Sequence, residues 1–218
     1  MSIRQKVLEA IERERLVAIV RGLDTAGVLA AVAAFYSEGV RLVEVTCNSP
    51  DAMKTIRALR EQYGENLHVG AGTVLDVESV FAAHEAGASF ILSPDTDTSV
   101  IAATRGAGMI SVPGALSATE VRTAQRAGAD IVKVFPAGSL GPAYIKDLLG
   151  PLNKSRFMVV GGVDLDNIAA FFKAGAMSAG IGSSLVNKTM VANNDAVGLA
   201  ALARRFLDTI AEATGGAA

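Results

Sequence analysis

Cysteine and histidine are scarce in this 218-residue chain. Cys47 is the only cysteine, which excludes an intrachain disulfide framework and suits a reducing cytoplasm. His68 and His84 are the only histidines, and no combination of these residues has the ligand spacing of a structural zinc site. Carboxylates could still hold magnesium, so the expected absence of a metal rests on this poverty of ligands.

Long apolar runs and strong charge imbalance are also missing. No apolar run approaches the roughly 18 residues of a membrane span, and residues 1–6 lead into a charged helical pattern without the apolar core of a signal peptide. The net charge is −2, with no basic stripe and no dinucleotide-binding fingerprint. We expect a cytoplasmic protein with no cofactor and no nucleic-acid or membrane partner.

Apolar residues make up 50% of the chain, enough for one sizeable core, and we predict a single domain over residues 1–218. Residues 2–13 place Ile3, Val7, Leu8 and Ile11 at helical spacing among charged residues. This pattern predicts an amphipathic helix that caps one end of the domain.

Strands and helices are then expected to alternate. Helices are predicted between short apolar strands, at residues 25–37, 52–62, from 77, 98–105, 118–126, 142–149 and 166–173, with a last one at 195–213. The expected strands are residues 16–20, 41–45, 67–70, 90–92, 109–112, a strand within 129–136, 157–160 and 178–181.

Glycines that end a helix just before a strand support this alternation. They stand at 39, 87, 108, 128 and 175, so their spacings of 48, 21, 20 and 47 correspond to one or two strand-plus-helix units. Eight such units predict a (β/α)8 TIM barrel with an extra N-terminal helix. An open, doubly wound sheet is the alternative, because strands buried on both faces occur in either fold.

One predicted strand carries an ammonium group among apolar residues. Side chains alternate between the faces of a strand, so Ile131, Lys133 and Phe135 share one face, while Val132 and Val134 share the other. Burial lowers the pKa of a lysine, and a neutral amine is a nucleophile. The alternative is a lysine at a strand end whose tip reaches solvent.

Glu44 is a similar exception in the second predicted strand, where it lies in line with Leu42 and Thr46. It could act in catalysis, or it could form a structural ion pair with Lys133 or Arg21, since such pairs also perturb pKa values. Arg21 follows the first strand, so all three groups are expected at the carboxyl ends of the strands, where barrel enzymes carry their chemistry.

Glycines and a hydroxyl follow several other strands. Residues 70–73, which end in Thr73, offer backbone N–H groups after the third strand, although a tight turn would also explain these glycines. Pro94 ends the fourth strand and helps to shape the barrel mouth. Glycine pairs after the seventh and eighth strands predict a phosphate site, because loops there commonly bind phosphate in this fold; they are Gly161-Gly162 and Gly180-Ile-Gly182-Ser183.

Together these residues resemble the 2-keto-3-deoxy-6-phosphogluconate (KDPG) and 2-keto-3-deoxy-6-phosphogalactonate (KDPGal) aldolases. The resemblance covers residues 16–186 and rests on the combination of motifs. These are Ile19-Val-Arg-Gly22, Val43-Glu-Val-Thr46, Gly70-Ala-Gly-Thr-Val-Leu75, Ile131-Val-Lys-Val-Phe-Pro136, Gly141-Pro-Ala-Tyr-Ile-Lys146, Val160-Gly-Gly162 and Gly180-Ile-Gly-Ser183.

The resemblance implies a class I pyruvate aldolase that acts on a small phosphorylated keto acid and commonly forms a homotrimer. Lys133 would form the Schiff base and Glu44 would be the general acid and base. Substrate binding is assigned to Arg21 and Thr73 at the carboxylate, to Gly162, Gly182 and Ser183 at the phosphate, and also to Pro94, Phe135 and Gly161.

One departure concerns the stretch after the second-strand motif, where one phosphogluconate branch has an arginine. Here Cys47-Asn-Ser49 stands at that place, and Arg21 supplies the guanidinium group. This arrangement resembles the galactonate enzymes and also other gluconate-branch members. Two other functions remain open from the residues alone: a phosphosugar isomerase or epimerase, with Glu44 as a base, and a catalytically silent phosphometabolite-binding protein.

Overall fold

Parallel strands form one sheet in the computed structural model, which describes residues 2–216. Neighbouring strands run in the order β5-β4-β3-β2-β1-β9-β8-β7-β6, and every pair is parallel. The strands are β1 (Leu16–Val20), β2 (Leu42–Thr46), β3 (His68–Gly72), β4 (Phe90–Leu92), β5 (Ile110–Val112), β6 (Gly114–Ala115), β7 (Val132–Val134), β8 (Phe157–Val160) and β9 (Ser178–Ile181).

The two ends of this order are halves of one barrel strand. Pro113 separates β5 from β6, and a proline has no N–H to give to a sheet. Its carbonyl still accepts the N–H of Lys133 at 2.8 Å, while β5 pairs with β4 and β6 pairs with β7. The chain therefore closes the barrel at Pro113, and the predicted (β/α)8 fold is confirmed with its fifth strand in two pieces.

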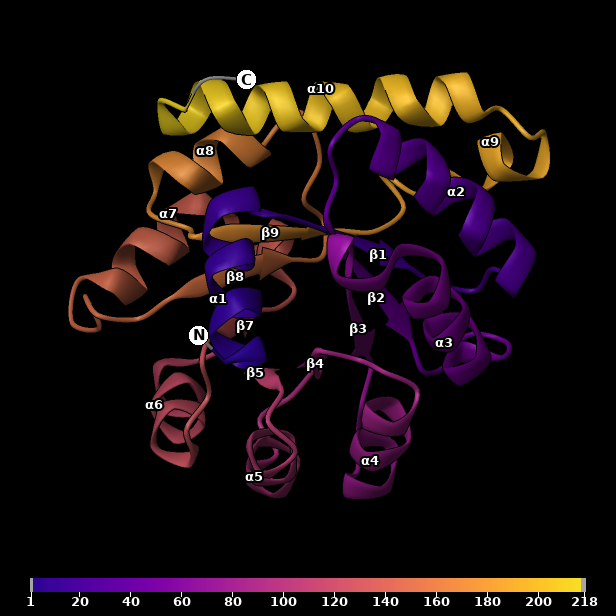
Figure 1. Ribbon diagram of the computed structural model, residues 1–218. Coiled ribbons are helices and arrows are strands. Elements are labelled where there is room, and N and C mark those ends of the chain that lie inside the picture. The colour runs from indigo at the N-terminus through magenta and orange to yellow at the C-terminus, as the bar shows by residue number, and fades with distance from the viewer. Residues whose placement is uncertain (1, 217–218) are drawn as a thin grey trace.

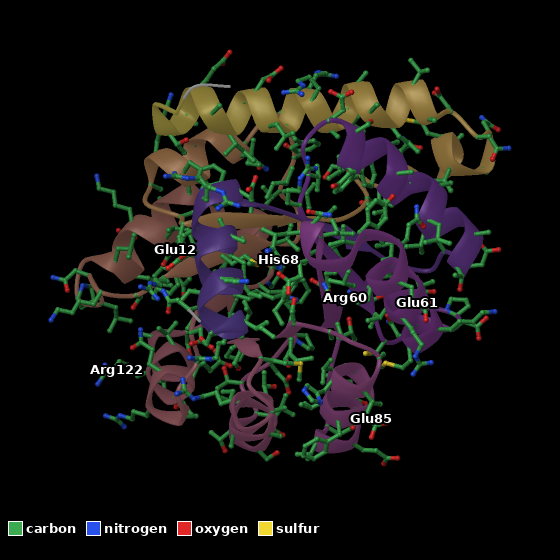
Figure 2. The ribbon with its side chains drawn as sticks, in the orientation of Figure 1. Glu12, Arg60, Glu61, His68, Glu85 and Arg122 are labelled. Atoms are coloured by element: carbon green, nitrogen blue, oxygen red, sulfur yellow. The ribbon has the colours of Figure 1, made fainter. Side chains whose placement is uncertain are left out.

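Helices surround the strands, as Figure 1 shows, with α10 lying along α2 and α8. Acidic and basic side chains on these helices point outward, as Glu61, Glu85 and Arg122 do in Figure 2. The helices are α1 (Ile3–Glu14), α2 (Thr25–Ser37), α3 (Ala52–Tyr63), η1 (Gly64–Asn66), α4 (Val77–Glu85), α5 (Thr98–Gly106), α6 (Ala118–Ala127), α7 (Ala137–Leu149), α8 (Ile168–Lys173), α9 (Lys188–Ala192) and α10 (Ala196–Thr214).

The boundaries of α7 differ from the prediction, which placed its start at residue 142. A first helical turn begins at Ala137, directly after β7, and the helix then bends at Gly141, where φ is 76°. The regular part after the bend does begin at Pro142, a residue whose fixed φ suits a first helical position. The extra turn brings the N–H of Gly138 to the carbonyl of Gly161 at 2.7 Å, which joins two loops of the barrel mouth.

Two hydrophobic clusters fill the molecule. One lies between the strands and the outer helices, and the other fills the barrel interior. In α1, Val7, Ala10 and Ile11 are buried and join the interior cluster. Because α1 leads directly into the start of β1, it covers the amino ends of the strands (Figure 1), and its predicted capping position is confirmed. The carboxyl ends are thereby left for a site.

Candidate active site

Lys133 lies at the centre of β7 and points into the barrel. Its side-chain neighbour on the same face, Ile131, belongs to the interior cluster, whereas Val132 and Val134 pack outward against the helices, as the alternation predicted. Lys133 is only 4% exposed, and its Nζ lies 4.9 Å from the ring centre of Phe135. Burial lowers the pKa of Lys133, the charge of Glu44 opposes this shift, and the guanidinium of Arg21 adds to it.

Glu44 enters the same interior from β2 and is 1% exposed. Burial raises the pKa of Glu44, against the opposing charges of Lys133 and Arg21. Its Oε2 atom is buried and has no hydrogen-bond partner among residues 2–216. An unpaired buried oxygen is costly for stability, which favours a functional role over a structural ion pair.

Gly72 of β3 makes room for this carboxylate. A Cβ atom at residue 72 would overlap the side chain of Glu44, just as one at Gly70 would overlap the ring of Phe90. The sequence pattern suggested that these glycines offer amides to a ligand. In the structure they provide space for neighbouring side chains, because both lie on the inner face of a barrel strand.

Arg21 follows β1 and reaches across the mouth to β3. Its guanidinium donates a hydrogen bond to the hydroxyl of Thr73 at 3.2 Å. The next residue, Gly22, donates its N–H to the hydroxyl of Ser49 at 2.8 Å, and Ser49 is within 2.8 Å of the hydroxyl of Thr46. The loops after β1, β2 and β3 thereby hold the arginine fork, which matches the geometry of a carboxylate.

The loops after β8 and β9 form the opposite side of the mouth. Gly161 and Gly162 have φ values of 84° and 71°, which side chains other than glycine rarely adopt. Gly182 and Ser183 follow β9, and the space beside Gly182 is open, since an added Cβ would meet no heavy atom within 4 Å. Backbone amides at such open, glycine-rich turns can approach an anion closely.

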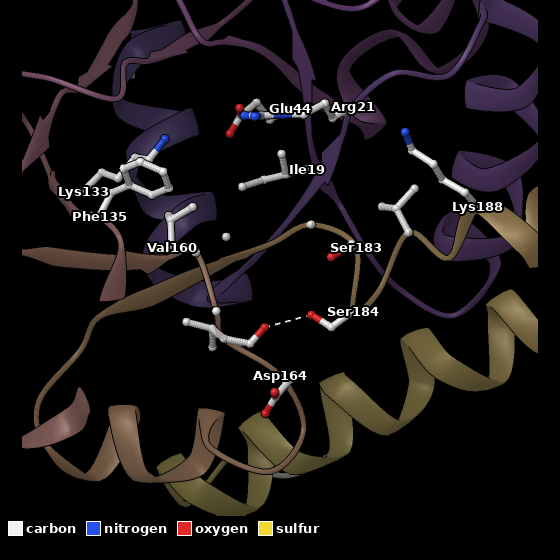
Figure 3. Close-up of a pocket in the computed structure, with 16 residues that line it drawn as sticks. Ile19, Arg21, Glu44, Lys133, Phe135, Val160, Asp164, Ser183, Ser184 and Lys188 are labelled. Atoms are coloured by element: carbon white, nitrogen blue, oxygen red, sulfur yellow. Dashed lines mark hydrogen bonds between the residues drawn. The ribbon is translucent and has the colours of Figure 1, made fainter. Parts of the chain in front are cut away.

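A single cavity of about 480 Å³ joins these groups, as Figure 3 shows. Eight of the predicted site residues line it: Arg21, Glu44, Lys133, Phe135, Gly161, Gly162, Gly182 and Ser183. Two others are outside its lining. Thr73 contacts the cavity through its bond to Arg21, and Pro94 packs its carbonyl against Gly114.

Several lining residues were missed by the sequence analysis. Val160 could have been found, because it stands on the inner face just before Gly161. Asp164 and Lys188 gave no such signal: Asp164 lies in the loop between β8 and α8, and Lys188 opens α9, a short helix beyond the last predicted strand. They add a carboxylate and an ammonium to the cavity wall (Figure 3).

Cys47, His68 and His84 are the other candidates for a reactive or metal-ligating side chain, besides Lys133 and Glu44. Burial, followed by the charges of Glu44 and Asp76, raises the pKa of the Cys47 thiol to about 11, so it stays protonated at neutral pH. His84 is exposed on α4, far along the chain from half-buried His68. Within residues 2–216, no three His, Cys, Asp or Glu side chains are grouped as metal ligands, and no helix is long and apolar enough to cross a membrane.

The sequence model of the KDPG and KHG aldolase family matches residues 7–202. The chain belongs to this family. It is 37% identical to 2-dehydro-3-deoxy-6-phosphogalactonate aldolase from Escherichia coli, over 89% of this chain and 96% of that protein. A 2-dehydro-3-deoxy-phosphogluconate aldolase from Treponema pallidum is 34% identical, over 94% of this chain and 97% of the relative.

The fold agrees with this family. A solved structure described as native KDPGal superimposes with a TM-score of 0.86 and 37% sequence identity, covering 92% of this chain and 96% of the other. The matches therefore cover nearly the full length of these relatives, and their fold is the barrel described above.

Proposed function

We propose that the protein is a class I pyruvate aldolase that cleaves a 2-keto-3-deoxy-6-phosphoaldonate, of the phosphogluconate or phosphogalactonate type, to pyruvate and glyceraldehyde 3-phosphate. The observation that carries this function is the buried Lys133 ammonium and the buried Glu44 carboxyl group in one cavity. The family favours aldol cleavage over a phosphosugar isomerase or a silent binding protein.

Lys133 begins the reaction as a neutral amine that attacks the ketone carbon, carbon 2, of the substrate. Loss of water from the resulting carbinolamine gives an iminium ion, which draws the electron pair of the bond between carbons 3 and 4. The cost of keeping an ammonium out of water favours the neutral amine, and the lowered pKa of Lys133 reflects this cost.

Glu44 moves the protons, directly or through a water. Its carboxylate accepts the proton of the carbon 4 hydroxyl while the bond between carbons 3 and 4 breaks. This step releases the aldehyde and leaves an enamine on Lys133. The protonated Glu44 then gives a proton to carbon 3, and hydrolysis of the pyruvate imine restores the amine. A raised pKa suits this double task, because it makes the protonated form of Glu44 more accessible than that of an ordinary carboxyl group.

Both ends of the substrate are held while this happens. Arg21, oriented by Thr73, binds the carboxylate, and the loop amides at Gly162, Gly182 and Ser183 bind the phosphate. Fixing two ends positions the bond between them over the reacting groups.

A coupled assay tests the function as a whole. The purified protein is incubated with each of the two epimeric phosphorylated keto acids, and pyruvate is followed with lactate dehydrogenase and NADH. Pyruvate should form from at least one epimer. Binding of both without pyruvate release would instead support a silent phosphometabolite-binding protein.

We also propose that the enzyme acts in the cytoplasm as a homotrimer. Its one cysteine, with a thiol that stays protonated, suits a reducing compartment. The trimer is the assembly implied by the family resemblance. Light scattering should give three times the 22.4 kDa of one chain, and a mass of one or two chains would contradict it.

Gly182→Asp is expected to remove the preference for phosphorylated substrates. The new carboxylate adds negative charge where backbone amides face the phosphate, but the open space and ordinary backbone at Gly182 should let the fold survive. The measurement compares kcat/KM for a phosphorylated keto acid and its non-phosphorylated analogue. Gly182→Ala is the matched control and should behave like the parent protein, and an unchanged preference in Gly182→Asp would refute this phosphate site.

Cleavage is expected to survive treatment with EDTA. The iminium ion serves as the electron sink that a Lewis-acid metal would otherwise supply, and ligand groups are sparse in the sequence. Activity is measured before and after chelation, and again after a divalent cation is added. Loss in EDTA followed by recovery with the cation would contradict the Schiff-base route.

A further inference from the structure

The loops after β8 and β9, which form the proposed phosphate site, carry no lysine or arginine of their own. Two positively charged side chains line the cavity elsewhere and have other roles. Arg21 donates a hydrogen bond to Thr73, near Glu44, and Lys133 is the buried nucleophile. The loops after β8 and β9 offer amides and a hydroxyl, which are neutral. They also bring Asp164 to the cavity wall, where its carboxylate accepts the N–H groups of Asp166 and Asn167.

A bound phosphate monoester would therefore face a carboxylate on the same wall. It carries a charge of about −1.5 to −2 at pH 7, and like charges disfavour binding unless a cation screens them. The remaining cation that lines this cavity in the described residues is Lys188.

Lys188 is well placed to supply that charge. It opens α9, just beyond the β9 loop that carries Gly182 and Ser183, and its side chain extends toward the β1 loop along the cavity rim (Figure 3). Its Nζ lies 2.9 Å from where a Cβ on Gly22 would stand, so the glycine leaves room for the ammonium. Lys188 is exposed, and it makes no ion pair with any carboxylate of residues 2–216.

We propose that Lys188 is a specificity-determining residue that binds the substrate phosphate and screens it from Asp164. This inference rests on the proposed function and adds a residue to its site. A flexible lysine stem lets the ammonium follow a mobile phosphate, whereas the amides of the two loops are fixed in direction. Selection for phosphorylated substrates then comes from one charged side chain and from the backbone together.

Lys188→Gln tests the proposal because it removes the charge and keeps a polar, flexible side chain. KM for the phosphorylated keto acid should rise by about 10- to 100-fold, the scale of one hydrogen bond to a charged group, with little change in kcat. The affinity for inorganic phosphate, measured by calorimetry, should fall by a similar factor. Lys188→Arg should restore most of both, and Lys173→Gln, at an exposed position of α8, should change neither.

Pyruvate trapping with borohydride separates this proposal from the proposed function, because pyruvate has no phosphate. Lys188→Gln should be labelled as fast as the parent protein. If KM and phosphate affinity stay unchanged, or if the arginine variant fails to restore them, Lys188 does not bind the phosphate. If the parent protein neither cleaves nor labels, the aldolase function fails instead, and phosphate calorimetry of the parent and Lys188→Gln still decides the role of Lys188.

Discussion

Borohydride reduction in the presence of pyruvate is expected to attach one covalent label to the protein, at Lys133. The amine adds to the ketone of pyruvate, water leaves, and hydride reduces the imine to a stable secondary amine. Replacement of Lys133 by arginine should abolish the label and lower cleavage by more than about 10⁴-fold, the scale of loss when a covalent nucleophile is removed.

The surroundings of Lys133 explain why it should react ahead of other lysines. Burial and the charge of Arg21 lower its pKa, although the charge of Glu44 opposes the shift, so a neutral fraction is available at lower pH than for a hydrated lysine. Lys54 and Lys173 are exposed and keep their hydration. They should be labelled far more slowly under brief treatment.

Peptide mass spectrometry locates the label, and two variants control the interpretation. Lys133→Arg keeps the charge and much of the volume, while Lys133→Met keeps an unbranched stem without the charge. Circular dichroism and thermal unfolding should show that at least one variant is folded. Pyruvate-dependent label at another residue, or rapid cleavage by either folded variant, would remove Lys133 from the catalytic role.

The alternation of side chains made this lysine visible in the sequence. A strand has a period of two, so Ile131 and Phe135 fix the side on which Lys133 lies, and Leu42 fixes the side of Glu44. Parallel strands of a barrel then bring both groups to one interior. Local pattern and fold class were enough to predict that these two residues lie in one cavity.

Contacts between distant segments could not be predicted in this way. The role of Gly72 depends on its pairing with Thr46 of β2, which sets it beside Glu44, and the sequence alone does not give that register. Lys188 belongs to a short helix that follows the last barrel strand, so nothing in its neighbours marked it as part of the cavity. Pro94 was expected at the site because it ends a strand, but it lies outside the cavity lining, with its carbonyl close to Gly114.

The split of the fifth strand was missed for a similar reason. The predicted fifth strand, residues 109–112, stops just before Pro113, which lacks the N–H that a sheet uses. In the structure its carbonyl remains in the sheet as the acceptor for Lys133, and Gly114 resumes the pairing one residue later. The proline therefore interrupts one side of the strand only, and its carbonyl helps to hold the backbone of Lys133.

Glu44→Gln is expected to slow cleavage by roughly 10²- to 10⁴-fold, the usual contribution of a positioned acid or base. Glutamine keeps the shape that fits beside Gly72 but can neither accept the carbon 4 hydroxyl proton nor return a proton to carbon 3. Formation of the pyruvate imine should be less impaired, because attack by Lys133 needs the amine itself. Rapid-quench measurement of cleavage and borohydride trapping of pyruvate distinguish the two steps.

The pH profile of cleavage gives an independent check on Glu44. Its carboxylate form is the base, and burial raises its pKa, so activity of the parent protein should begin to fall with decreasing pH at a higher pH than for an ordinary carboxyl group. Glu44→Gln should lose this acidic limb along with most of its rate, whereas Glu61→Gln, at an exposed position of α3, should keep both. A near-normal rate and an unchanged limb in Glu44→Gln would contradict the catalytic role. Glu44 would then be a structural residue whose charge serves only to balance that of Lys133.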